Sequence, residues 1–251
     1  MSFLGLEGSS ILITGASSGI GREIAVAAAR EGARVAIAAR DSRRLDETRA
    51  ILDGADHIAL EADLSDPDAI TDVVLEAARR LDGLNGLVHA AGVQRTEPLR
   101  SVTPERLEDV FAVNVTAAVM LVKAFRMRAV HRPDSSVVLL GSVAGLVGQP
   151  AATAYSASKG ALIAATRSLA VELARETIRV NCICPGFVST PMTDAVRSTI
   201  GDAAFDRIVA SHPLGLGNPE DVANAALFLL SPASRWMTGS TLTIDGGYTA
   251  Q

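Results

Sequence analysis

The chain has 251 residues, of which 48% are hydrophobic and 4% aromatic, and its formal net charge is −5. This acidic balance argues against nucleic acid as the main partner. The composition is too apolar for disorder, and a chain of about this length buries roughly 70–75% of its unfolded surface. Charged or turn-forming residues interrupt each apolar stretch before about 18 positions accumulate, so we expect neither a transmembrane helix nor a membrane partner.

The first residues and the cysteines bear on the cellular compartment. The opening seven residues contain no basic segment followed by an apolar one, so we expect no secretory signal and a cytoplasmic protein. Cys182 and Cys184 stand one residue apart in an apolar, strand-like run. We interpret them as small buried hydrophobes rather than redox groups or metal ligands, and we predict no metal site.

Apolar strand-like runs alternate with alanine-rich helical runs along the whole chain. In order, we predict strand Ser10–Thr14, helix Ile20–Arg30, strand Arg34–Ala39, helix Ser42–Leu52, strand His57–Leu60, helix Pro67–Leu81, strand Gly86–Ala90, helix Pro104–Val130, strand Ser136–Leu140, helix Ala154–Ala174, strand Ile178–Cys184, helix Pro219–Leu230 and strand Thr241–Ile244. Strands this apolar are buried on both faces, which predicts an α/β fold: a doubly wound parallel seven-stranded sheet with helices on both faces. No linker divides the chain, so residues 1–251 are predicted to form a single domain.

The segment Ser189–Leu216 departs from this alternation. Prolines and glycines bracket a short helical piece within it. Irregular segments of this length in a compact domain are often functional, and we predict a lid over a substrate site.

A glycine-rich turn joins the first predicted strand to the first predicted helix, with glycines at Gly15, Gly19 and Gly21. Such a turn lets the backbone approach a pyrophosphate, and the helix dipole favours its negative charge. The same residues fit the G-x-S-x-G pattern of a hydrolase, but that elbow requires earlier strands to supply an oxyanion donor. No lysine follows Gly21, which excludes a Walker-type NTPase. We therefore predict a dinucleotide site.

The choice of dinucleotide depends on the end of the second predicted strand, where Arg40 and Asp41 are adjacent. An acid there would bind the ribose 2′-hydroxyl of NAD, whereas a cation would accommodate the 2′-phosphate of NADP. Spacing alone leaves both readings open.

A second group of residues is suited to acid–base catalysis. Tyr155 and Lys159 stand at i and i+4 of a predicted helix, so a phenol and an ammonium share one face. A fixed cation favours the phenolate, and we expect the pKa of Tyr155 to be lowered toward neutrality for acid–base work. Ser142 follows a buried strand, at the sheet edge where ligands bind in such folds. Asn114 is a poor helix former inside an apolar helical run, with a kink or a core amide as the plain interpretation.

Together these residues strongly resemble the short-chain dehydrogenase/reductase family, and most of all its 3-oxoacyl-[acyl-carrier-protein] reductase-type members. The family's Thr-Gly-x-x-x-Gly-x-Gly turn is present at residues 14–21, its catalytic Asn-Ser-Tyr-Lys tetrad as Asn114, Ser142, Tyr155 and Lys159, and its Pro-Gly stretch at residues 185–190. The resemblance covers essentially the whole chain. It implies a Rossmann fold and hydride transfer between a nicotinamide cofactor and a ketone or secondary alcohol, and a 3-oxoacyl thioester is one candidate substrate.

The resemblance also implies roles for single residues. Tyr155 would exchange the proton, Lys159 would hold the nicotinamide ribose, Ser142 would bind the substrate oxygen, and Asn114 would anchor a water in a proton relay. The cofactor would be bound by Gly15, Ser17, Ser18, Gly19, Ile20, Arg40, Asp63, Leu64, Ala91, Gly92, Tyr155, Lys159, Pro185, Gly186, Val188 and Thr190.

Two departures from the family pattern concern the cofactor and the fourth strand. Ala39 followed by Arg40 resembles the members that prefer NADP, with NAD as the alternative, although Ser18 stands where many NADP enzymes have a second cation. His89-Ala90-Ala91-Gly92 replaces the family's Asn-Asn-Ala-Gly. The missing amide at Ala90 removes a side-chain bond that ties this strand to its neighbour.

Substrate and partners are predicted from the flanking segments. A pocket bordered mainly by apolar residues favours an aliphatic or acyl ketone over a hydroxylated sugar; its predicted residues are Val143, Leu146, Val147, Gln149, Met192, Val196, Phe205, Ile208 and His212. The alternatives are a polyol or sugar dehydrogenase that uses NAD, and a catalytically silent nucleotide sensor. A basic cluster at the end of helix Pro104–Val130 suggests docking of an acyl carrier protein; it comprises Lys123, Arg126, Arg128, His131 and Arg132.

The helix Ala154–Ala174 bears on assembly, because it is small or apolar around most of its circumference. A surface helix should have one apolar stripe. We therefore expect its far side to pack on another subunit in a homodimer or homotetramer, as the family's members do.

Overall fold

The computed structural model describes residues 4–250. Its centre is a seven-stranded parallel sheet in the order β3-β2-β1-β4-β5-β6-β7. The strands are β1 (Ser10–Thr14), β2 (Arg34–Ala39), β3 (Ile58–Glu61), β4 (Leu84–His89), β5 (His131–Leu140), β6 (Arg179–Pro185) and β7 (Thr241–Ile244). The strand order reverses between β1 and β4, and such a switch point opens a crevice at the carboxyl ends of the strands. The predicted sheet is confirmed.

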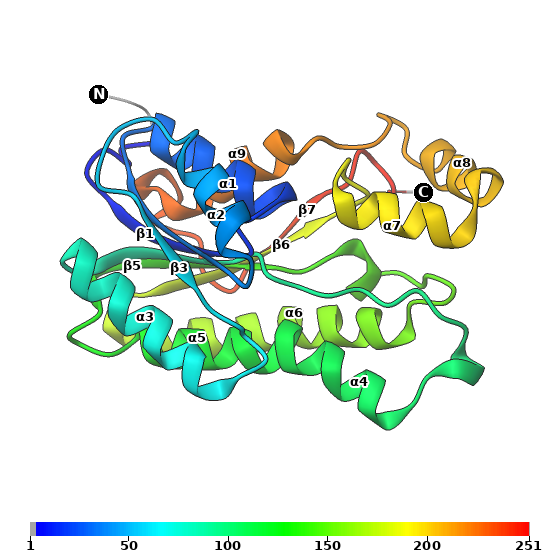
Figure 1. The fold of residues 1–251 in the computed structure, drawn as a ribbon, viewed down its shortest axis with the longest axis horizontal. Coiled ribbons are helices and arrows are strands. Elements are labelled where there is room, and N and C mark those ends of the chain that lie inside the picture. Colours follow the sequence, from blue (N-terminus) through cyan, green and yellow to red (C-terminus); the bar gives the residue numbers. More distant parts are fainter. Residues whose placement is uncertain (1–3, 251) are drawn as a thin grey trace.

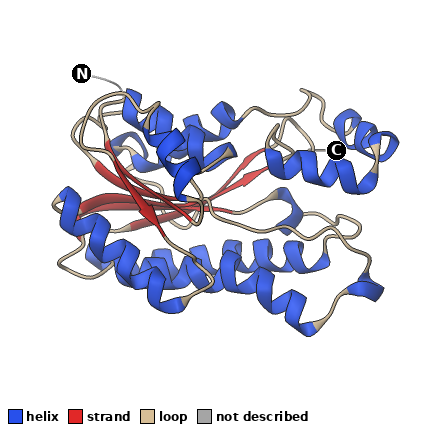
Figure 2. Ribbon diagram, viewed as in Figure 1, coloured by secondary structure: helices blue, strands red, loops and turns tan. Residues whose placement is uncertain are grey.

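Helices cover both faces of the sheet (Figures 1 and 2). One layer contains α1 (Gly19–Arg30), α2 (Ser42–Arg49) and α9 (Pro219–Leu230). The opposite layer contains α3 (Pro67–Leu81), α4 (Pro104–Phe111), α5 (Ala117–Phe125) and α6 (Thr153–Leu173). This two-sided arrangement is the doubly wound architecture that the alternation of strands and helices predicts.

Alternation along β1 shows how one strand serves two cores. Ile11 and Ile13 pack into the layer that contains α1 and α9. Leu12, between them, packs into the layer that contains α3 and α5. Successive side chains of a strand point to opposite faces, so a strand covered on both sides is buried at every position and mainly apolar. All five residues of β1 are buried.

The predicted helix Pro104–Val130 is wrong in its details. The chain forms α4, then a π-helical segment at Ala112–Thr116, then α5, which ends at Phe125. Strand β5 begins at His131, five residues before the predicted Ser136. The helix is interrupted around Asn114, whose side chain is fully buried and accepts a hydrogen bond from the backbone nitrogen of Val93 instead of extending to solvent. π-helical segments of this kind often lie at functional sites.

The segment 189–216 contains two helices, α7 (Pro191–Ile200) and α8 (Asp202–Ala210), where we predicted one short piece. Gly201 separates them with a φ of +81°, and an ion pair of 2.7 Å between Arg197 and Asp202 spans the break. The two helices lie beside the carboxyl ends of β6 and β7 (Figure 1). The action of the segment 189–216 as a lid stays a prediction.

Two further observations concern the described residues as a whole. Within residues 4–250, no helix combines the length and apolar character needed to cross a bilayer. In the same part of the chain, no cluster of three or more His, Cys, Asp or Glu side chains is arranged to hold a metal ion. Cys182 and Cys184 are buried free thiols whose sulfur atoms lie 4.0 Å apart, in agreement with their interpretation as core residues.

Candidate active site

The glycine turn is packed too tightly for any side chain at two of its positions. A Cβ atom on Gly15 would lie 2.5 Å from the backbone nitrogen of Ala91, and one on Gly21 would lie 2.4 Å from the carbonyl oxygen of Gly15. Gly15 also has a φ of +70°, which L-residues other than glycine rarely adopt. The turn therefore folds back on the start of α1 and on the segment after β4, and the backbone is left bare at the switch point.

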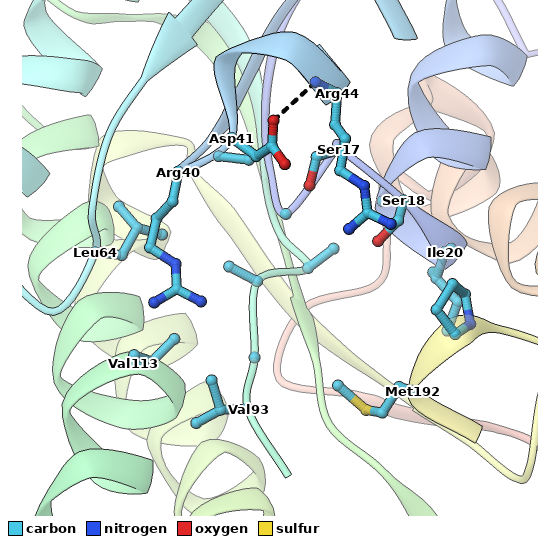
Figure 3. Close-up of a pocket in the computed structure, with 18 of the residues that line it drawn as sticks. Ser17, Ser18, Ile20, Arg40, Asp41, Arg44, Leu64, Val93, Val113 and Met192 are labelled. Carbon is cyan, nitrogen blue, oxygen red and sulfur yellow. Dashed lines mark hydrogen bonds between the residues drawn. The ribbon is translucent and has the colours of Figure 1, made fainter. Parts of the chain in front are cut away.

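A cavity of about 650 Å³ opens above this turn, at the carboxyl ends of β1, β2 and β4 (Figure 3). Its size is within the range of small-molecule and cofactor sites. Eleven of the predicted cofactor residues line it: Gly15, Ser17, Ser18, Gly19, Ile20, Arg40, Asp63, Leu64, Ala91, Gly92 and Thr190. A second pocket of about 110 Å³ is lined by the remaining predicted cofactor residues, Tyr155, Lys159, Pro185, Gly186 and Val188, together with Ser142.

Asp41 and Arg40 play different parts at the edge of the large cavity. The Asp41 carboxylate accepts a hydrogen bond of 3.0 Å from the backbone nitrogen of Arg44 and so caps α2. The capping bond gives this acid a structural function. Arg40, in contrast, is exposed at the cavity edge with its guanidinium directed toward Val113 (Figure 3). Arg44 also lines the cavity, and our reading of the sequence did not include it.

Asp63 is suited to accept hydrogen bonds from a ligand. Its carboxylate accepts bonds from the backbone nitrogen of Ser65 (3.0 Å) and from the Ser65 hydroxyl (2.8 Å). These bonds, together with the charge of Arg40, hold the pKa of Asp63 below its usual value against a desolvation effect that would raise it. An ionised acceptor at the cavity wall fits the expected contact with an adenine amino group.

Tyr155 and Ser142 line the same pocket because of their positions in the fold. Tyr155 lies near the start of α6, and Ser142 follows the carboxyl end of β5, where it caps a short 3₁₀ turn through a 3.2 Å bond from the nitrogen of Ala144. Burial raises the pKa of Tyr155 to about 12, and its hydrogen bond with Ser142 acts in the opposite direction.

The predicted lowering of the Tyr155 pKa by Lys159 is therefore wrong for this structure. The Lys159 ammonium lies 5.5 Å from the centre of the Tyr155 ring and donates a 2.6 Å hydrogen bond to the carbonyl oxygen of Leu140. Burial lowers the pKa of Lys159 itself to about 8. Desolvation thus dominates both groups. At neutral pH the phenol is protonated and the ammonium is charged, which suits Tyr155 to donate a proton.

Asn114 connects three segments around the small pocket. Its carbonyl oxygen accepts a 2.8 Å bond from the nitrogen of Val93, and its amide nitrogen donates to the Val93 carbonyl oxygen (3.0 Å) and to the Ser158 hydroxyl (2.9 Å). A Cβ atom on Gly92 would lie 3.3 Å from the Asn114 oxygen and 3.5 Å from the Lys159 nitrogen. Asn114 and Lys159 therefore border the same point of the pocket wall. The expected role of Asn114 as the anchor of a water stays a prediction.

His89 provides a connection where the family's amide is missing at Ala90. Its Nδ1 lies 3.0 Å from the Thr14 hydroxyl on β1, and its Nε2 lies 3.2 Å from the carbonyl oxygen of Val113 in the π-helical segment. Full burial and, to a smaller extent, the charge of Lys159 lower the pKa of His89 to about 3. A neutral imidazole with Nε2–H donating to Val113 satisfies both contacts, with the Thr14 hydroxyl as donor to Nδ1.

The substrate pocket differs from our prediction. Val143, Gln149 and Met192 line the small pocket as expected. The other predicted residues do not line it: Leu146, Val147, Val196, Phe205, Ile208 and His212. Its polar lining includes Gln94, which we did not predict. Val196 and Phe205 are buried, and the Phe205 ring contacts Phe187 edge-on, with ring centres 6.5 Å apart, so only the start of α7, at Met192 and Thr193, lines the pocket.

His212 is a structural residue. Its Nδ1 lies 2.7 Å from the Ile208 carbonyl oxygen, its Nε2 accepts a 3.2 Å bond from the nitrogen of Phe187, and its ring stacks on Tyr248 at 4.6 Å. It has no ring nitrogen left for a substrate oxygen. A Cβ atom on Gly186 would lie 3.0 Å from the His212 ring and 2.9 Å from the Cα of Asp245, so packing also explains this glycine.

The predicted basic cluster is partly neutralised. Arg126 forms an ion pair of 2.5 Å with Glu176, and Arg132 forms one of 2.8 Å with Asp82. Both acids come from segments distant in the sequence, which is why the linear pattern suggested a larger excess of positive charge. Lys123 and Arg128 form no ion pair within the described residues.

A crevice at the switch point of a parallel sheet, with a phenol and an ammonium at its inner end, defines a class of nucleotide-dependent oxidoreductases. Comparison with known proteins makes this specific. A family model described as enoyl-(acyl carrier protein) reductase matches residues 15–249. The chain belongs to the short-chain dehydrogenase/reductase family, and it is an oxidoreductase that acts on alcohol or ketone groups with a nicotinamide cofactor.

Three relatives illustrate the range of this family. 2-(S)-Hydroxypropyl-CoM dehydrogenase 3 of Xanthobacter autotrophicus is 37% identical over 250 residues, which are 98% of each chain. A 3-oxoacyl-[acyl-carrier-protein] reductase of Thermotoga maritima is 36% identical and covers 96% of this chain and 98% of its own. A solved structure of a proposed 2-deoxy-D-gluconate 3-dehydrogenase from Agrobacterium tumefaciens, with bound NADP, matches with a TM-score of 0.89 and 34% identity over all of both chains.

Proposed function

We propose that this protein is an NADPH-dependent reductase of a small ketone. The observation that carries the proposal is that Ser142, Tyr155 and Lys159 line one pocket, with the Lys159 ammonium 5.5 Å from the Tyr155 ring centre. This pocket shares Ile20, Ala90, Gly92, Thr190 and Met192 with the nucleotide cavity. A relative in structure binds NADP. Two arginines at the outer edge of the cavity favour NADP over NAD.

The residues present fit a dinucleotide. Close packing at Gly15 and Gly21 brings the turn against α1 and the segment after β4, and the Ser18 side chain does not cap α1, which leaves the first backbone N–H groups of that helix to a pyrophosphate. Asp63 and Leu64 would hold the adenine, Ala91 and Gly92 the adjoining ribose, Lys159 and Tyr155 the nicotinamide ribose, and Val188 and Thr190 the carboxamide. When bound, the cofactor supplies the hydride.

The protein's own residues then transfer the proton. Ser142 and Tyr155 donate hydrogen bonds to the substrate oxygen, and the phenolic proton of Tyr155 transfers to that oxygen as it gains negative charge. The Lys159 ammonium stabilises the phenolate that this leaves. Asn114 holds the Val93 backbone and Ser158 in place beside the ammonium. Because burial raises the pKa of Tyr155 to about 12, the phenol holds its proton at neutral pH and begins reduction in the form that donates it.

Gln94 and Gln149 favour a hydroxylated ketone over the aliphatic ketone that we expected. Both line the pocket of Ser142 and Tyr155, and within residues 4–250 neither carboxamide makes a hydrogen bond. A 2.8 Å backbone bond from Glu97 to Ala151 ties the two loops that contain them. Two unpaired amides that border a reacting oxygen suit a substrate with neighbouring hydroxyl groups, since such sites disfavour analogues that lack them.

The test is a substrate panel with NADPH and NADH in parallel, monitored by oxidation of the reduced cofactor. The panel contains ketoses, their deoxy analogues and acetoacetyl thioesters. We expect turnover with NADPH, and we expect Gln149→Leu to slow the ketose at least tenfold more than its deoxy analogue. Binding of NADPH without turnover of any carbonyl would favour a nucleotide sensor, and activity with NADH alone would contradict the cofactor assignment.

Assembly as a homodimer or homotetramer is part of the proposal. Val171 on α6 is 82% exposed, and Trp236, between α9 and β7, is 93% exposed. Large apolar side chains this exposed suit contacts between subunits. Light scattering of the wild-type protein should give at least a dimer, and Val171→Glu should lower the mass if α6 forms the interface. A wild-type monomer in dilute solution would contradict this.

Docking of an acyl carrier protein is a narrower proposal, as is a cytoplasmic location. A relative is named a 3-oxoacyl-[acyl-carrier-protein] reductase. In this chain, Lys123 and Arg128 are the cations of the basic cluster that acids leave available. Reversing both to Glu should raise the KM of a carrier-bound thioester without changing that of the free thioester. Equal effects on both substrates would contradict docking.

A further inference from the structure

A pair of thiols lies beneath the backbone that leads from β5 to Ser142. Cys182 and Cys184 stand at i and i+2 of β6, so their side chains share one face, and both are fully buried with sulfur atoms 4.0 Å apart. A Cβ atom on Gly141 would lie 2.7 Å from the Cys182 sulfur and 2.8 Å from the Cys184 sulfur. The two sulfur atoms therefore fill the space beside Gly141 that a side chain would otherwise occupy.

The Gly141 backbone lies between β6 and the catalytic groups. Its nitrogen donates a 2.7 Å bond to the carbonyl oxygen of the residue between the two cysteines. On one side of Gly141, the Leu140 carbonyl oxygen accepts the 2.6 Å bond from the Lys159 ammonium. On the other side, Ser142 forms the hydrogen bond with Tyr155. A shift of this backbone would displace the acceptor of the ammonium and the partner of the phenol together.

The thiols also border the Lys159 ammonium. Burial lowers the pKa of Lys159 to about 8, and Cys182 and Cys184 each act in the opposite direction. In the described part of the chain, the other titratable groups around the ammonium are Tyr155 on α6 and His89 on β4, with pKa values of about 12 and about 3. Neither of these two groups changes its charge near pH 8. Sulfur is polarisable and a weak acceptor, so the pair favours a neighbouring cation more than methyl groups would.

We propose that Cys182 and Cys184 are positioning residues for proton transfer. Their sulfur atoms hold the Gly141 backbone in place and so keep the carbonyl acceptor of the Lys159 ammonium within hydrogen-bond distance. Smaller side chains would leave a gap beside Gly141, and bulkier ones would displace it. The inference deepens the proposed function and rests on it, because the ammonium stabilises the phenolate that reduction leaves.

The direct test is the titration of Lys159, which needs no substrate. Lys123 and Lys159 are the lysines of the sequence, so protein labelled with ¹³C at the lysine ε-carbon gives one NMR signal for each. The signal of Lys123, which is exposed on α5, is the internal reference. We expect Lys159 to titrate near pH 8 in the wild type. With Cys182→Ala and Cys184→Ala together, it should titrate about one pH unit lower, because a displaced carbonyl stabilises the ammonium less.

Kinetics and control variants accompany the titration. The double alanine variant should lower kcat for ketone reduction about tenfold, because the catalytic groups are misplaced, and should change NADPH affinity less than about threefold. Replacing both thiols by serine, which keeps an acceptor at each position, should recover part of the shift and of the rate. Val180→Ala removes core volume from the same face of β6 and is the matched control. It should leave the titration of Lys159 unchanged.

An exchange of volume tests the packing itself. Gly141→Ala alone should lower kcat at least about 100-fold, because its Cβ would meet both sulfur atoms. In the double alanine background the same substitution has room, and it should raise kcat at least about tenfold above Gly141→Ala alone. Equal activity of Gly141→Ala with and without the two sulfur atoms would overturn the packing role.

The outcomes separate the inference from the proposed function. If Lys159 titrates at the same pH in the wild type and in the double alanine variant, the role of the thiols is overturned and the reductase activity is untouched. An equal shift in Val180→Ala would show a general effect of lost packing and would also overturn it. If the shift is found but the wild-type protein reduces no ketone, the proposed function fails, and the thiols support the ammonium without a part in reduction.

Discussion

The side-chain amide of Asn114 is paired with the backbone of Val93 in both directions, through bonds of 2.8 and 3.0 Å. This pairing joins the π-helical segment to the chain that leaves β4, and the remaining amide hydrogen is donated to Ser158 on α6. A substitution of Asn114 disturbs this junction but leaves the glycine turn in place. We therefore expect it to affect proton transfer more than cofactor binding.

We predict that Asn114→Ala lowers kcat about 100-fold, because a small misplacement of catalytic groups has effects of this size. The affinity for NADPH should change by less than about threefold, since Asn114 does not line the large cavity. Steady-state kinetics and cofactor titration measure the two quantities. An unchanged kcat, or equal losses in both, would contradict the assignment.

The pH dependence of reduction should follow Lys159. The ammonium is needed to stabilise the Tyr155 phenolate, and its pKa is about 8. We predict that kcat/KM for reduction is constant below this pH and falls above it. Lys159→Arg keeps a positive charge at all accessible pH values, so any residual activity should lose the break near pH 8. A wild-type profile that is flat to pH 10 would contradict the role of Lys159.

Lys159 should also reduce stability at neutral pH. Its pKa is 10.5 in the unfolded chain and about 8 when folded, so the unfolded chain binds more protons between these values and stability rises with pH across this window. The fold therefore bears the cost of the buried charge below pH 8. We predict that Lys159→Met is less destabilising, or more stabilising, at pH 7 than at pH 10.5, by a few kcal/mol. Urea unfolding at both values measures the difference.

His89 should make the protein sensitive to acid. Its pKa is 6.5 when unfolded and about 3 when folded, so its contribution to stability is complete above pH 6.5 and is lost as the pH falls toward 3. We predict that His89→Asn reduces the acid slope of the unfolding free energy by up to about 1.4 kcal/mol per pH unit in this range. His131→Asn, near the surface, controls for the loss of an imidazole. Identical slopes for His89→Asn and the wild type would contradict a buried neutral ring.

The sequence was sufficient for the sheet because apolar runs and punctuating residues are local signals. It was also sufficient to bring Ser142, Tyr155 and Lys159 together, since Ser142 follows a strand and the other two share one helix face. The π-helical segment could not be predicted, because the Asn114 bonds to Val93 depend on how β4 and α4 pack. The sequence also could not predict that Arg44 forms no ion pair within the described residues. The arginines at positions 43, 44 and 49 look alike in the sequence, and only the structure shows that Arg43 pairs with Glu47 and Arg49 with Asp46.

The pKa of Tyr155 shows that residue spacing alone does not predict how a titratable group is shifted. The i and i+4 spacing placed a cation beside the phenol, as predicted, but spacing carries no information about solvent. Both groups are buried, and desolvation acts on each in the direction opposite to their mutual effect. The structure therefore favours a proton donor where the sequence suggested a phenolate.

The most direct test of the central claim compares binding and turnover in Tyr155→Phe. Loss of one hydroxyl removes the proton donor and one expected contact to the nicotinamide ribose, but it leaves the large cavity, which Tyr155 does not line, with all its residues. We predict that NADPH binds within threefold of the wild-type affinity and that ketone reduction falls by at least about 10³-fold. Reduction at more than a tenth of the wild-type rate, with NADPH binding retained, would show that another group supplies the proton and would contradict the account.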